Sequence, residues 1–451
     1  MEKVPELPGR AASWALLVLL AVYAVVVHVL LQLPANAFRP EFNNGDALDY
    51  HLAALNLYQH GFQPHPTRMF GFPLLTGWIV LFDPSFRSYA WCCYVFNAVC
   101  WLGSIWLLLG MGRQMFGAHN RISLLPALLF GINIGNIVLI SQPVTETLYV
   151  FLLLLAGRLW LRYLQNGLSG WAIAAFAVFC YTTVVRPTAT IWLLVFIPAL
   201  LLHVRQHGPA LKKMAVGMVL SLVMTLGLQV ALMKARYDLW VTSNIGLLTY
   251  YLYVDAYASS ETPGASWSQR GKDWEKERDH RKEILRWGPI GWKDLVNDID
   301  WKSSRFIMEQ QRAATWSDHR PALLQSYARN LVSNSLGTSM IVEFLANRSE
   351  DKTVVKSAQF FGWLSRLQNA LYSFLTMLFA LLAGCHLFIR KRLAWFDFLA
   401  LFNISILLFS AISFAQGDRF HLVFMPFAAL LLIRQIVLWT KQKPENILGQ
   451  A

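Results

Sequence analysis

Charged residues are scarce in this 451-residue chain, at 14% of the composition, whereas hydrophobic residues account for 56%. Soluble proteins average about 25% charged residues, so the imbalance argues against a soluble protein and is typical of a polytopic membrane protein. Cysteine is also scarce, with five residues, and none lies in the polar stretch from 234 to 366. A disulfide framework or a cysteine-based zinc site is therefore not expected.

Acidic residues are fewer than basic ones, and the net charge is +13. A nucleic-acid partner would need these bases concentrated on one face, and no such concentration is present. The Lys and Arg residues instead recur in the short connections between apolar stretches. The sequence therefore predicts that they set membrane topology, and no nucleic-acid partner is expected.

Long apolar runs dominate the rest of the chain. A bilayer core requires about 20 apolar residues per helix, and this length criterion predicts about ten transmembrane helices. They are expected near 13–33, 88–110, 122–140, 146–164, 170–185, 187–204, 214–233, 367–389, 393–415 and 420–439.

The basic residues predict which side of the membrane each connection occupies. With a cytoplasmic N-terminus, the cytoplasmic segments hold a large set of Lys and Arg, and the short outside turns hold few. The cytoplasmic set is Lys3, Arg10, Arg113, Arg121, Arg158, Arg162, Arg205, Lys212, Lys213, Arg390, Lys391, Arg392, Lys441 and Lys443. We therefore expect both termini to be cytoplasmic.

Two polar regions then face outside, within one transmembrane domain over 1–439 that is followed by a cytoplasmic tail over 440–451. The first outside loop, 34–87, is expected to hold interfacial helices, beginning with an amphipathic helix after Gly45. The second, 234–366, lies between the seventh and eighth spans and is longer than a connector requires. Its alternating charges from Arg270 to Arg286 predict a solvated helix.

A pair of carboxylates, Asp46 and Asp49, opens the first outside loop and is followed by Tyr50. Asp46 and Asp49 are three residues apart, so they share one face of a helix. Two close carboxylates raise the pKa of one of them, which suits a base near neutral pH. The alternative is that Asp46 only caps the helix, because Asn43, Asn44 and Gly45 precede it.

The order of short motifs resembles the GT-C glycosyltransferases, in the branch of protein O-mannosyltransferases and bacterial aminoarabinose transferases. The family places an acid four positions before a Tyr in this loop, as Asp46 and Tyr50 do here. Its second acid directly follows the first, whereas this chain has Ala47 there and Asp49 later. The remaining matches are Gly71-Phe-Pro-Leu-Leu75, Ser141-Gln-Pro-Val-Thr-Glu146-Thr-Leu-Tyr149, Arg186-Pro187-Thr188 and Asp418-Arg419 through Pro426.

The resemblance implies an all-α GT-C-like bundle and an inverting enzyme that transfers a sugar from a polyprenyl-phosphate donor to an extracytoplasmic glycan, lipid or protein hydroxyl. The bacterial inner membrane is favoured over the endoplasmic reticulum because the chain is short and lacks retention signals, so the active site is expected to face the periplasm. A carboxylate would take the hydroxyl proton, and arginines would hold the phosphate. We expect Asp46 and Asp49 to be catalytic, Arg186, Arg419, Arg68 and His421 to bind donor phosphate, and Glu146, Tyr50 and Tyr250 to bind substrate.

Several alternatives stay open at this level. Glu146 pairs with Arg186 or binds the sugar, and the arginines either hold phosphate or reach toward lipid head groups. No His cluster is present, so neither a metal nor another cofactor is expected. A lipid-linked sugar transporter or flippase would also be polytopic, although it would usually show internal repeats. An O-antigen-ligase-like transferase would use His and Arg of a late outside loop.

Overall fold

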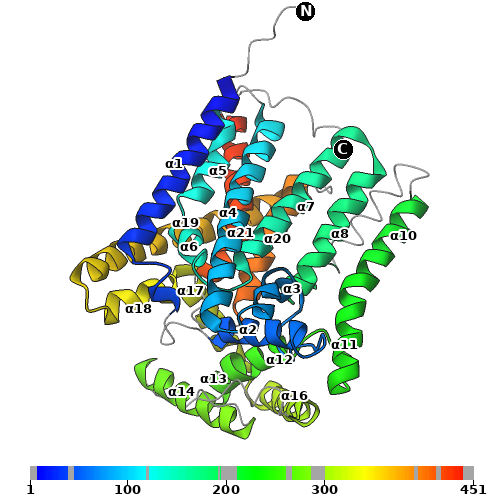
Figure 1. Ribbon diagram of the computed structural model, residues 1–451, viewed down its shortest axis with the longest axis vertical. Helices are drawn as coiled ribbons and strands as arrows, with labels where there is room; N and C mark the ends of the chain where they lie inside the picture. Colours follow the sequence, from blue (N-terminus) through cyan, green and yellow to red (C-terminus); the bar gives the residue numbers. More distant parts are fainter. Residues whose placement is uncertain are drawn as a thin grey trace, which may run out of the picture.

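The computed structural model describes residues 8–38, 45–117, 121–190, 193, 211–260, 267–285, 300–390, 395–412 and 418–439, and within these ranges all regular structure is helical (Figure 1). The main helices are α1 (Pro8–Leu30), α2 (Gly45–Tyr58), α3 (Gly71–Thr76), α4 (Phe86–Phe116), α5 (Leu125–Gly131), α6 (Ile134–Leu139), α7 (Glu146–Asn166), α8 (Ser169–Val185), α10 (Leu211–Leu222), α11 (Leu228–Tyr237), α12 (Ile245–Thr249), α13 (Ala256–Ser259), α14 (Trp267–Ile284), α16 (Trp301–Asp318), α17 (Arg320–Leu336), α18 (Met340–Arg348), α19 (Lys352–Arg390), α20 (Trp395–Ser410) and α21 (Asp418–Trp439).

Six of the described helical stretches are long and apolar enough to cross a membrane. They are Ala11–Leu30, Phe86–Phe116, Glu146–Asn166, Met214–Tyr237, Lys352–Ile389 and His421–Leu438. Shorter apolar helices, including Ser169–Val185 and Leu399–Ser410, account for further predicted spans. The span expected over 122–140 is divided into α5 and α6 at Ile132 and Asn133. The span expected over 187–204 lies almost wholly outside the described residues.

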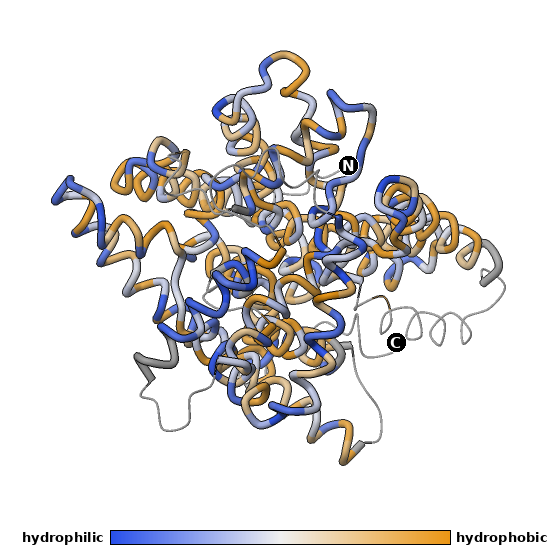
Figure 2. The backbone as a smooth tube through the Cα atoms, turned by 90° about the horizontal axis from the view of Figure 1, so that it is seen from below, coloured by the Kyte–Doolittle hydropathy of each residue, from blue (hydrophilic) through white to orange (hydrophobic). Residues whose placement is uncertain are grey.

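The outer helices expose their apolar side chains. On α1, Val18, Leu19, Val22 and Val25 are all exposed, although this stretch is strongly hydrophobic. Exposing neighbouring apolar side chains of this kind to water is unfavourable, so this face of α1 is suited to contact with lipid. Orange, the hydrophobic colour, accordingly runs along much of the tube in Figure 2. The all-α polytopic architecture predicted from the sequence is confirmed at this level.

The interior of the bundle is formed by α7 and α21. Of their most apolar windows, 61% and 72% are buried, compared with 28% for α1. Helix α21 packs on α5, α6, α7 and α20, and α7 also contacts α4 and α8. Both inner helices begin with charged residues, Glu146 in α7 and Asp418-Arg419 in α21. Their starts therefore bring charge to one end of an otherwise apolar core.

The same end of the bundle carries α2, α3 and the helices of the second polar region. Figure 1 shows α12, α13, α14 and α16 gathered beyond α2, away from the start of α1. Helix α2 lies where the amphipathic helix was predicted after Gly45, and its residues Asp49, His51 and Ala54 are all buried. The His51 Nε2 atom lies 2.9 Å from the carbonyl oxygen of Pro84, so the end of the first loop folds over this helix.

Helix α14 corresponds to the predicted charged helix, although one of its arginines is an anchor. Arg281 is 2% exposed and donates through Nη1 to the Asp255 carboxylate at 2.9 Å and to the Tyr251 carbonyl at 3.1 Å. Asp255 and Tyr251 belong to a π-helical segment, Tyr250–Asp255. A buried charge requires such partners, so this contact attaches α14 to the segment Tyr250–Asp255 of the second polar region.

Gly71 sets how closely α3 approaches α8. A Cβ atom added at this position would lie 2.5 Å from the Val184 carbonyl oxygen, a backbone atom that cannot rotate away. Gly71→Ala should therefore lower the unfolding free energy by about 1–3 kcal/mol, the usual cost of overpacking. Thermal unfolding in detergent measures this effect. Gly170→Ala is the matched control, because nothing lies within 4 Å of its added Cβ, and equal melting temperatures for the two variants would contradict the expectation.

Candidate active site

The site begins with Asp46 and Asp49, one turn apart on α2, and with Arg68 in the loop that follows. Gly61 and Phe62 adopt positive φ angles of 77° and 61°, and the chain reverses there after α2. The reversed loop places Arg68 against both aspartates. Its Nη2 atom binds Asp46 Oδ1 and also lies 2.9 Å from Asp49 Oδ2, and its Nε lies 3.0 Å from that same oxygen. Arg68 was the third phosphate candidate in the sequence, and it lies at the centre of the cluster.

Three further charged residues extend the cluster: Glu146 and Arg419 from the inner helices, and Arg186 from the end of α8. Arg419 Nη1 lies 2.5 Å from Asp46 Oδ2, and Arg419 Nε lies 2.5 Å from Glu146 Oε1. Arg186 Nη1 is 3.0 Å from the same Glu146 oxygen. Arg186 stands directly after α8, which ends at Val185 because the residue before Pro187 favours extended backbone. The structure therefore shows the Glu146–Arg186 pairing that the sequence left open.

We call this arrangement the ionic chain. Its members alternate in sign from one end to the other: Asp49, Arg68, Asp46, Arg419, Glu146 and Arg186. Contacts of this kind between guanidinium and carboxylate groups are strong and fix geometry. Alternation means that the four inner charges have a neighbour of opposite sign on each side and the two end charges have one, which makes their burial tolerable.

Asp46 is the most exposed carboxylate of the ionic chain. Its side chain is 24% exposed, whereas the side chains of Asp49 and Glu146 are fully buried. Asp46 is the second residue of α2, and both of its carboxylate oxygens bind arginine. These contacts do not support the capping-only alternative for Asp46. An incoming molecule would therefore meet the carboxylate of Asp46 before it met the other two carboxylates.

The two aspartates have opposite pKa shifts. Burial disfavours the charged form of both, but the guanidinium groups of Arg68 and Arg419 hold the pKa of Asp46 well below its usual range. Burial raises the pKa of Asp49 to about 7, because Arg68 offsets only part of the desolvation and the Asp46 charge adds to it. The carboxylate with a pKa near neutrality is thus the inner one, Asp49, whereas the three-residue spacing did not indicate which of the two it would be.

This shift predicts a pH-dependent stability. Between the ordinary Asp value of 3.8 and about 7, the folded state binds the proton of Asp49 more tightly than the unfolded state does. Asp49 therefore contributes stability at low pH that is lost as the pH rises through this window. In Asp49→Asn, the fall in unfolding free energy from pH 4 to pH 7 should be smaller by on the order of 3 kcal/mol. Thermal unfolding in detergent at several pH values measures it, and parallel curves for the two proteins would contradict the assignment.

Tyr50 also lies at the ionic chain. The guanidinium of Arg68 is 5.2 Å from the centre of the Tyr50 ring, whose other neighbour is Phe72 at 5.3 Å. Burial raises the pKa of Tyr50, so its hydroxyl stays protonated at neutral pH. The ring supports Arg68 from one side through a cation–π contact. Tyr50 thus lies against Arg68, and its contact with substrate stays a prediction.

Two predicted residues have different surroundings. His421 follows Arg419 by two positions and is buried, and its Nε2 atom lies 2.8 Å from the hydroxyl of Ser373 on α19. Tyr250 packs against a small apolar cluster that contains Val254 and Leu323. These contacts give no support to His421 as a phosphate ligand or to Tyr250 as a sugar contact.

The residues that hold the Arg68 loop were not recognisable from the sequence. Four hydrogen bonds reach this loop from the segment 229–244, which is distant in sequence. They are Gln229 Oε1 with Phe70 N at 3.3 Å, Tyr237 Oη with Pro64 O at 3.0 Å, Ser243 Oγ with Thr67 O at 2.9 Å, and Asn244 N with Pro66 O at 3.0 Å. None of these residues belongs to a motif, so only the fold reveals their part in positioning Arg68.

His65 is a second residue that sequence reasoning missed. It is buried, and its Nδ1 atom accepts hydrogen bonds from the backbone N–H groups of Thr67 at 3.3 Å and Arg68 at 3.2 Å. Burial, followed by the charge of Arg68, lowers its pKa well below the ordinary value. A neutral imidazole that accepts these bonds fixes the backbone of Arg68.

A metal ion has no evident ligand set within the described residues, where no group of three His, Cys, Asp or Glu side chains has suitable geometry. The chain does contain one Asp-x-Asp sequence, Asp298-Ile299-Asp300, which weakens the sequence argument against a metal. Asp298 lies outside the described residues. Asp300 accepts hydrogen bonds from the backbone N–H groups of Lys302 and Ser303 at the start of α16, and this accounts for its carboxylate structurally.

No family model and no curated protein matches the chain. Solved structures that are similar to it include two of one protein. The structure of ArnT from Cupriavidus metallidurans bound to undecaprenyl phosphate has 14% sequence identity and a TM-score of 0.39, over 96% of this chain and 81% of that chain. The same protein in the apo state has 14% identity and a TM-score of 0.37, over 95% of this chain and 78% of that chain. At similarities this low, the function of the chain has to be argued from its own residues.

Proposed function

We propose that this protein is an integral-membrane glycosyltransferase that takes a sugar from a polyprenyl-phosphate donor and transfers it, with inversion, to an acceptor hydroxyl. The observation that carries the proposal is the ionic chain, in which Asp46 lies between Arg68 and Arg419 at one end of a lipid-exposed helical bundle. Four members of the ionic chain, Asp46, Glu146, Arg186 and Arg419, come from the motifs that resemble the GT-C family. A fifth, Arg68, comes from the loop between two of those motifs.

The arginines provide the phosphate site. A guanidinium group presents a planar fork of donors that matches phosphate oxygens, and Arg68 and Arg419 flank the most exposed carboxylate. With every member ionised, the ionic chain is neutral, because three carboxylates face three guanidinium groups. Protonation of Asp49, whose pKa is about 7, leaves one net positive charge. That charge matches the single negative charge of a sugar phosphodiester.

Asp46 is the proposed general base. The phosphate draws Arg68 and Arg419 away from Asp46, which weakens the interactions that keep the pKa of Asp46 low and restores its basicity. The acceptor hydroxyl transfers its proton to Asp46 as its oxygen bonds to the anomeric carbon. The bond from that carbon to the phosphate oxygen breaks on the opposite face, and polyprenyl phosphate leaves with both electrons. Attack opposite to the leaving group inverts the anomeric centre.

We also propose that the site faces the periplasm of a bacterial inner membrane, with both termini in the cytoplasm and one catalytic domain over 1–439. The distribution of Lys and Arg supports this orientation. The helices of both polar regions, 34–87 and 234–366, gather at the site end of the bundle in Figure 1. Both regions must lie on the same side of the membrane if they are to form a single extracytoplasmic site.

The test is an in vitro assay of the purified protein in nanodiscs. A panel of polyprenyl-phosphate sugars is offered together with candidate glycan and lipid acceptors, and released polyprenyl phosphate is measured. We expect release from one class of donor and only in the presence of an acceptor. Movement of the intact donor across a vesicle membrane without phosphate release would contradict the proposal and favour a flippase.

A further inference from the structure

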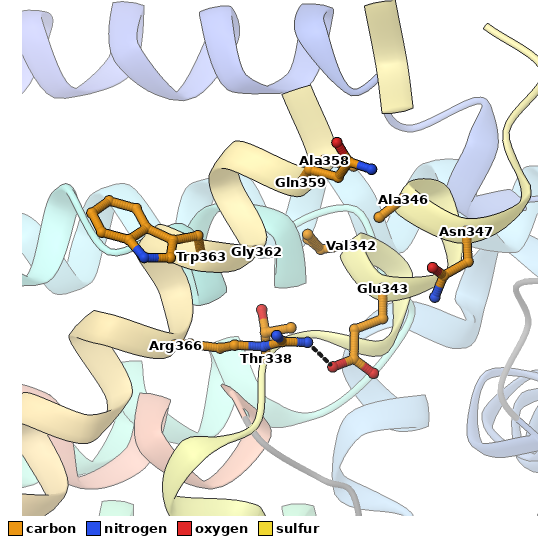
Figure 3. Close-up of a pocket in the computed structure, with 10 residues that line it drawn as sticks. All are labelled: Thr338, Val342, Glu343, Ala346, Asn347, Ala358, Gln359, Gly362, Trp363 and Arg366. Carbon is orange, nitrogen blue, oxygen red and sulfur yellow. Dashed lines mark hydrogen bonds and ion pairs between the residues drawn. The ribbon is translucent and has the colours of Figure 1, made fainter. Parts of the chain in front are cut away.

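A polar pocket lies between α18 and the first turns of α19, apart from the residues of the ionic chain. Its volume is about 390 Å³, which is within the range of small-molecule sites. The lining residues include Glu343 and Asn347 on α18 and Gln359, Trp363 and Arg366 on α19. Figure 3 shows Glu343 facing Arg366, whereas the Trp363 indole is directed away from α18. The Arg366 Nη2 atom lies 3.0 Å from the Glu343 Oε1 atom across this space.

Thr338 gives the pocket an unsatisfied polar group. The residue is 4% exposed, lines the pocket, and its hydroxyl oxygen has no hydrogen-bond partner among the residues that the structure describes. Leaving a buried hydroxyl unpaired is costly, so native structures usually supply a partner. A ligand hydroxyl in the pocket would be such a partner.

The lining residues indicate the chemistry of the ligand. Glu343 and Arg366 cancel each other's charge, so the pocket has no net attraction for a phosphate. Together with the amides of Asn347 and Gln359 and the hydroxyl of Thr338, they offer donors and acceptors in alternation. Such a set suits a neutral molecule with several hydroxyl groups. Trp363 also lines the pocket, and its indole, which is 61% exposed, provides an apolar ring face at the edge of the pocket on the α19 side.

The surroundings indicate that the ligand also has a membrane anchor. Large apolar side chains are exposed at three- or four-residue spacing from the pocket along α19 into its apolar part. They are Phe360, Trp363, Leu367, Leu371 and Phe374. This spacing forms one continuous helix face, and the pocket lies where that face begins. A position in an interfacial aromatic belt would explain the exposed Trp363 without a ligand. It would not explain why polar side chains line the pocket.

The pocket opens at the same end of the bundle as the ionic chain. Gln32, in the segment that follows α1 and precedes α2, donates from Nε2 to Asp351 Oδ2 at 2.8 Å, one residue before α19 begins. Figure 1 likewise places α18 toward the end of the bundle that carries α2. A lipid bound in the pocket would therefore lie in the membrane leaflet next to the proposed site.

We propose that this pocket binds the saccharide head group of a membrane glycolipid. The head group fills the space between Glu343, Arg366 and Thr338, and the acyl chains lie along the exposed face of α19. Binding of the glycolipid is independent of transfer. Only the further step, that the bound glycolipid is the acceptor, rests on the proposed function.

The test uses the full-length protein in phosphatidylcholine nanodiscs, to which diglucosyl diacylglycerol or phosphatidylglycerol with the same acyl chains is added. Lipid retained after detergent release is counted by native mass spectrometry. We expect preferential retention of the glycolipid. Thr338→Val, which removes one hydrogen bond at constant shape, should weaken retention about 3- to 10-fold, and Trp363→Ala should weaken it about 10-fold.

Trp316→Ala is the matched control, because Trp316 is a comparably exposed indole on α16 that does not line the pocket. Equal retention of the two lipids, or losses in Trp316→Ala as large as those in Trp363→Ala, would overturn the proposal. The transfer assay on the same preparations separates the two claims. Glycolipid retention by a protein that turns over no donor refutes only the proposed function, and turnover without preferential retention refutes only the pocket.

Discussion

Asp46→Asn should lower kcat for sugar transfer by about 10²- to 10⁴-fold, the usual contribution of a general base, without raising KM for the donor. Asparagine keeps the size of the side chain but cannot accept the acceptor's proton. Arg68 retains Asp49, and Arg419 retains Glu146, so both cations keep a carboxylate partner in the variant. Released polyprenyl phosphate, measured over a range of donor concentrations, separates kcat from KM.

Asp279→Asn is the control, because Asp279 is an exposed carboxylate on α14 outside the ionic chain. Thermal unfolding of Asp46→Asn shows whether the protein remains folded. A loss confined to KM would assign Asp46 to substrate binding, and unchanged transfer would remove it from the mechanism. Either result would contradict its role as base.

Arg419→Lys should lower kcat/KM for the donor by about 10²-fold although the positive charge is kept. The guanidinium reaches Asp46 through Nη1 and Glu146 through Nε, both at 2.5 Å. A single ammonium group cannot reproduce this planar fork. Arg419→Ala should in addition destabilise the protein by about 3–5 kcal/mol, because it removes a shared partner from a fully buried carboxylate.

Steady-state kinetics over the donor concentration, together with thermal unfolding, check both variants. Arg320→Lys is the control, because Arg320 is exposed on α17 and bonds to a backbone carbonyl. Full activity of Arg419→Lys would show that charge alone suffices at this position, and the proposed phosphate fork would then be wrong.

The bundle was largely predictable because span length and apolar composition are local properties of a chain. The acids and bases of the site were recognisable for a related reason. Asp46, Glu146 and Arg419 are charged residues at the edges of apolar runs, where an ionisable group is a functional candidate. Their mutual contacts, which join segments as distant as 46 and 419, required the fold.

Other features of the site depend on how remote segments cover it. The pKa order of Asp46 and Asp49 follows from full burial of Asp49 and from the position of Arg419, and neither can be deduced from their three-residue spacing. The support of the Arg68 loop by Ser243 and Asn244 is similarly invisible. Backbone hydrogen bonds of this kind have no sequence signature.

The alternating signs along the ionic chain have a consequence for how the donor arrives. Opposite charges held this close largely cancel at a distance, and at most one net positive charge remains when Asp49 is protonated. The site therefore produces only a weak long-range field and steers anions from solution little. A donor anchored by its polyprenyl tail needs no such steering, because its search is confined to the plane of the bilayer. Water-soluble sugar phosphates, which have no such anchor, would then reach the site less often than the lipid-linked donor does. The site would therefore discriminate against them before they contact Arg68 or Arg419.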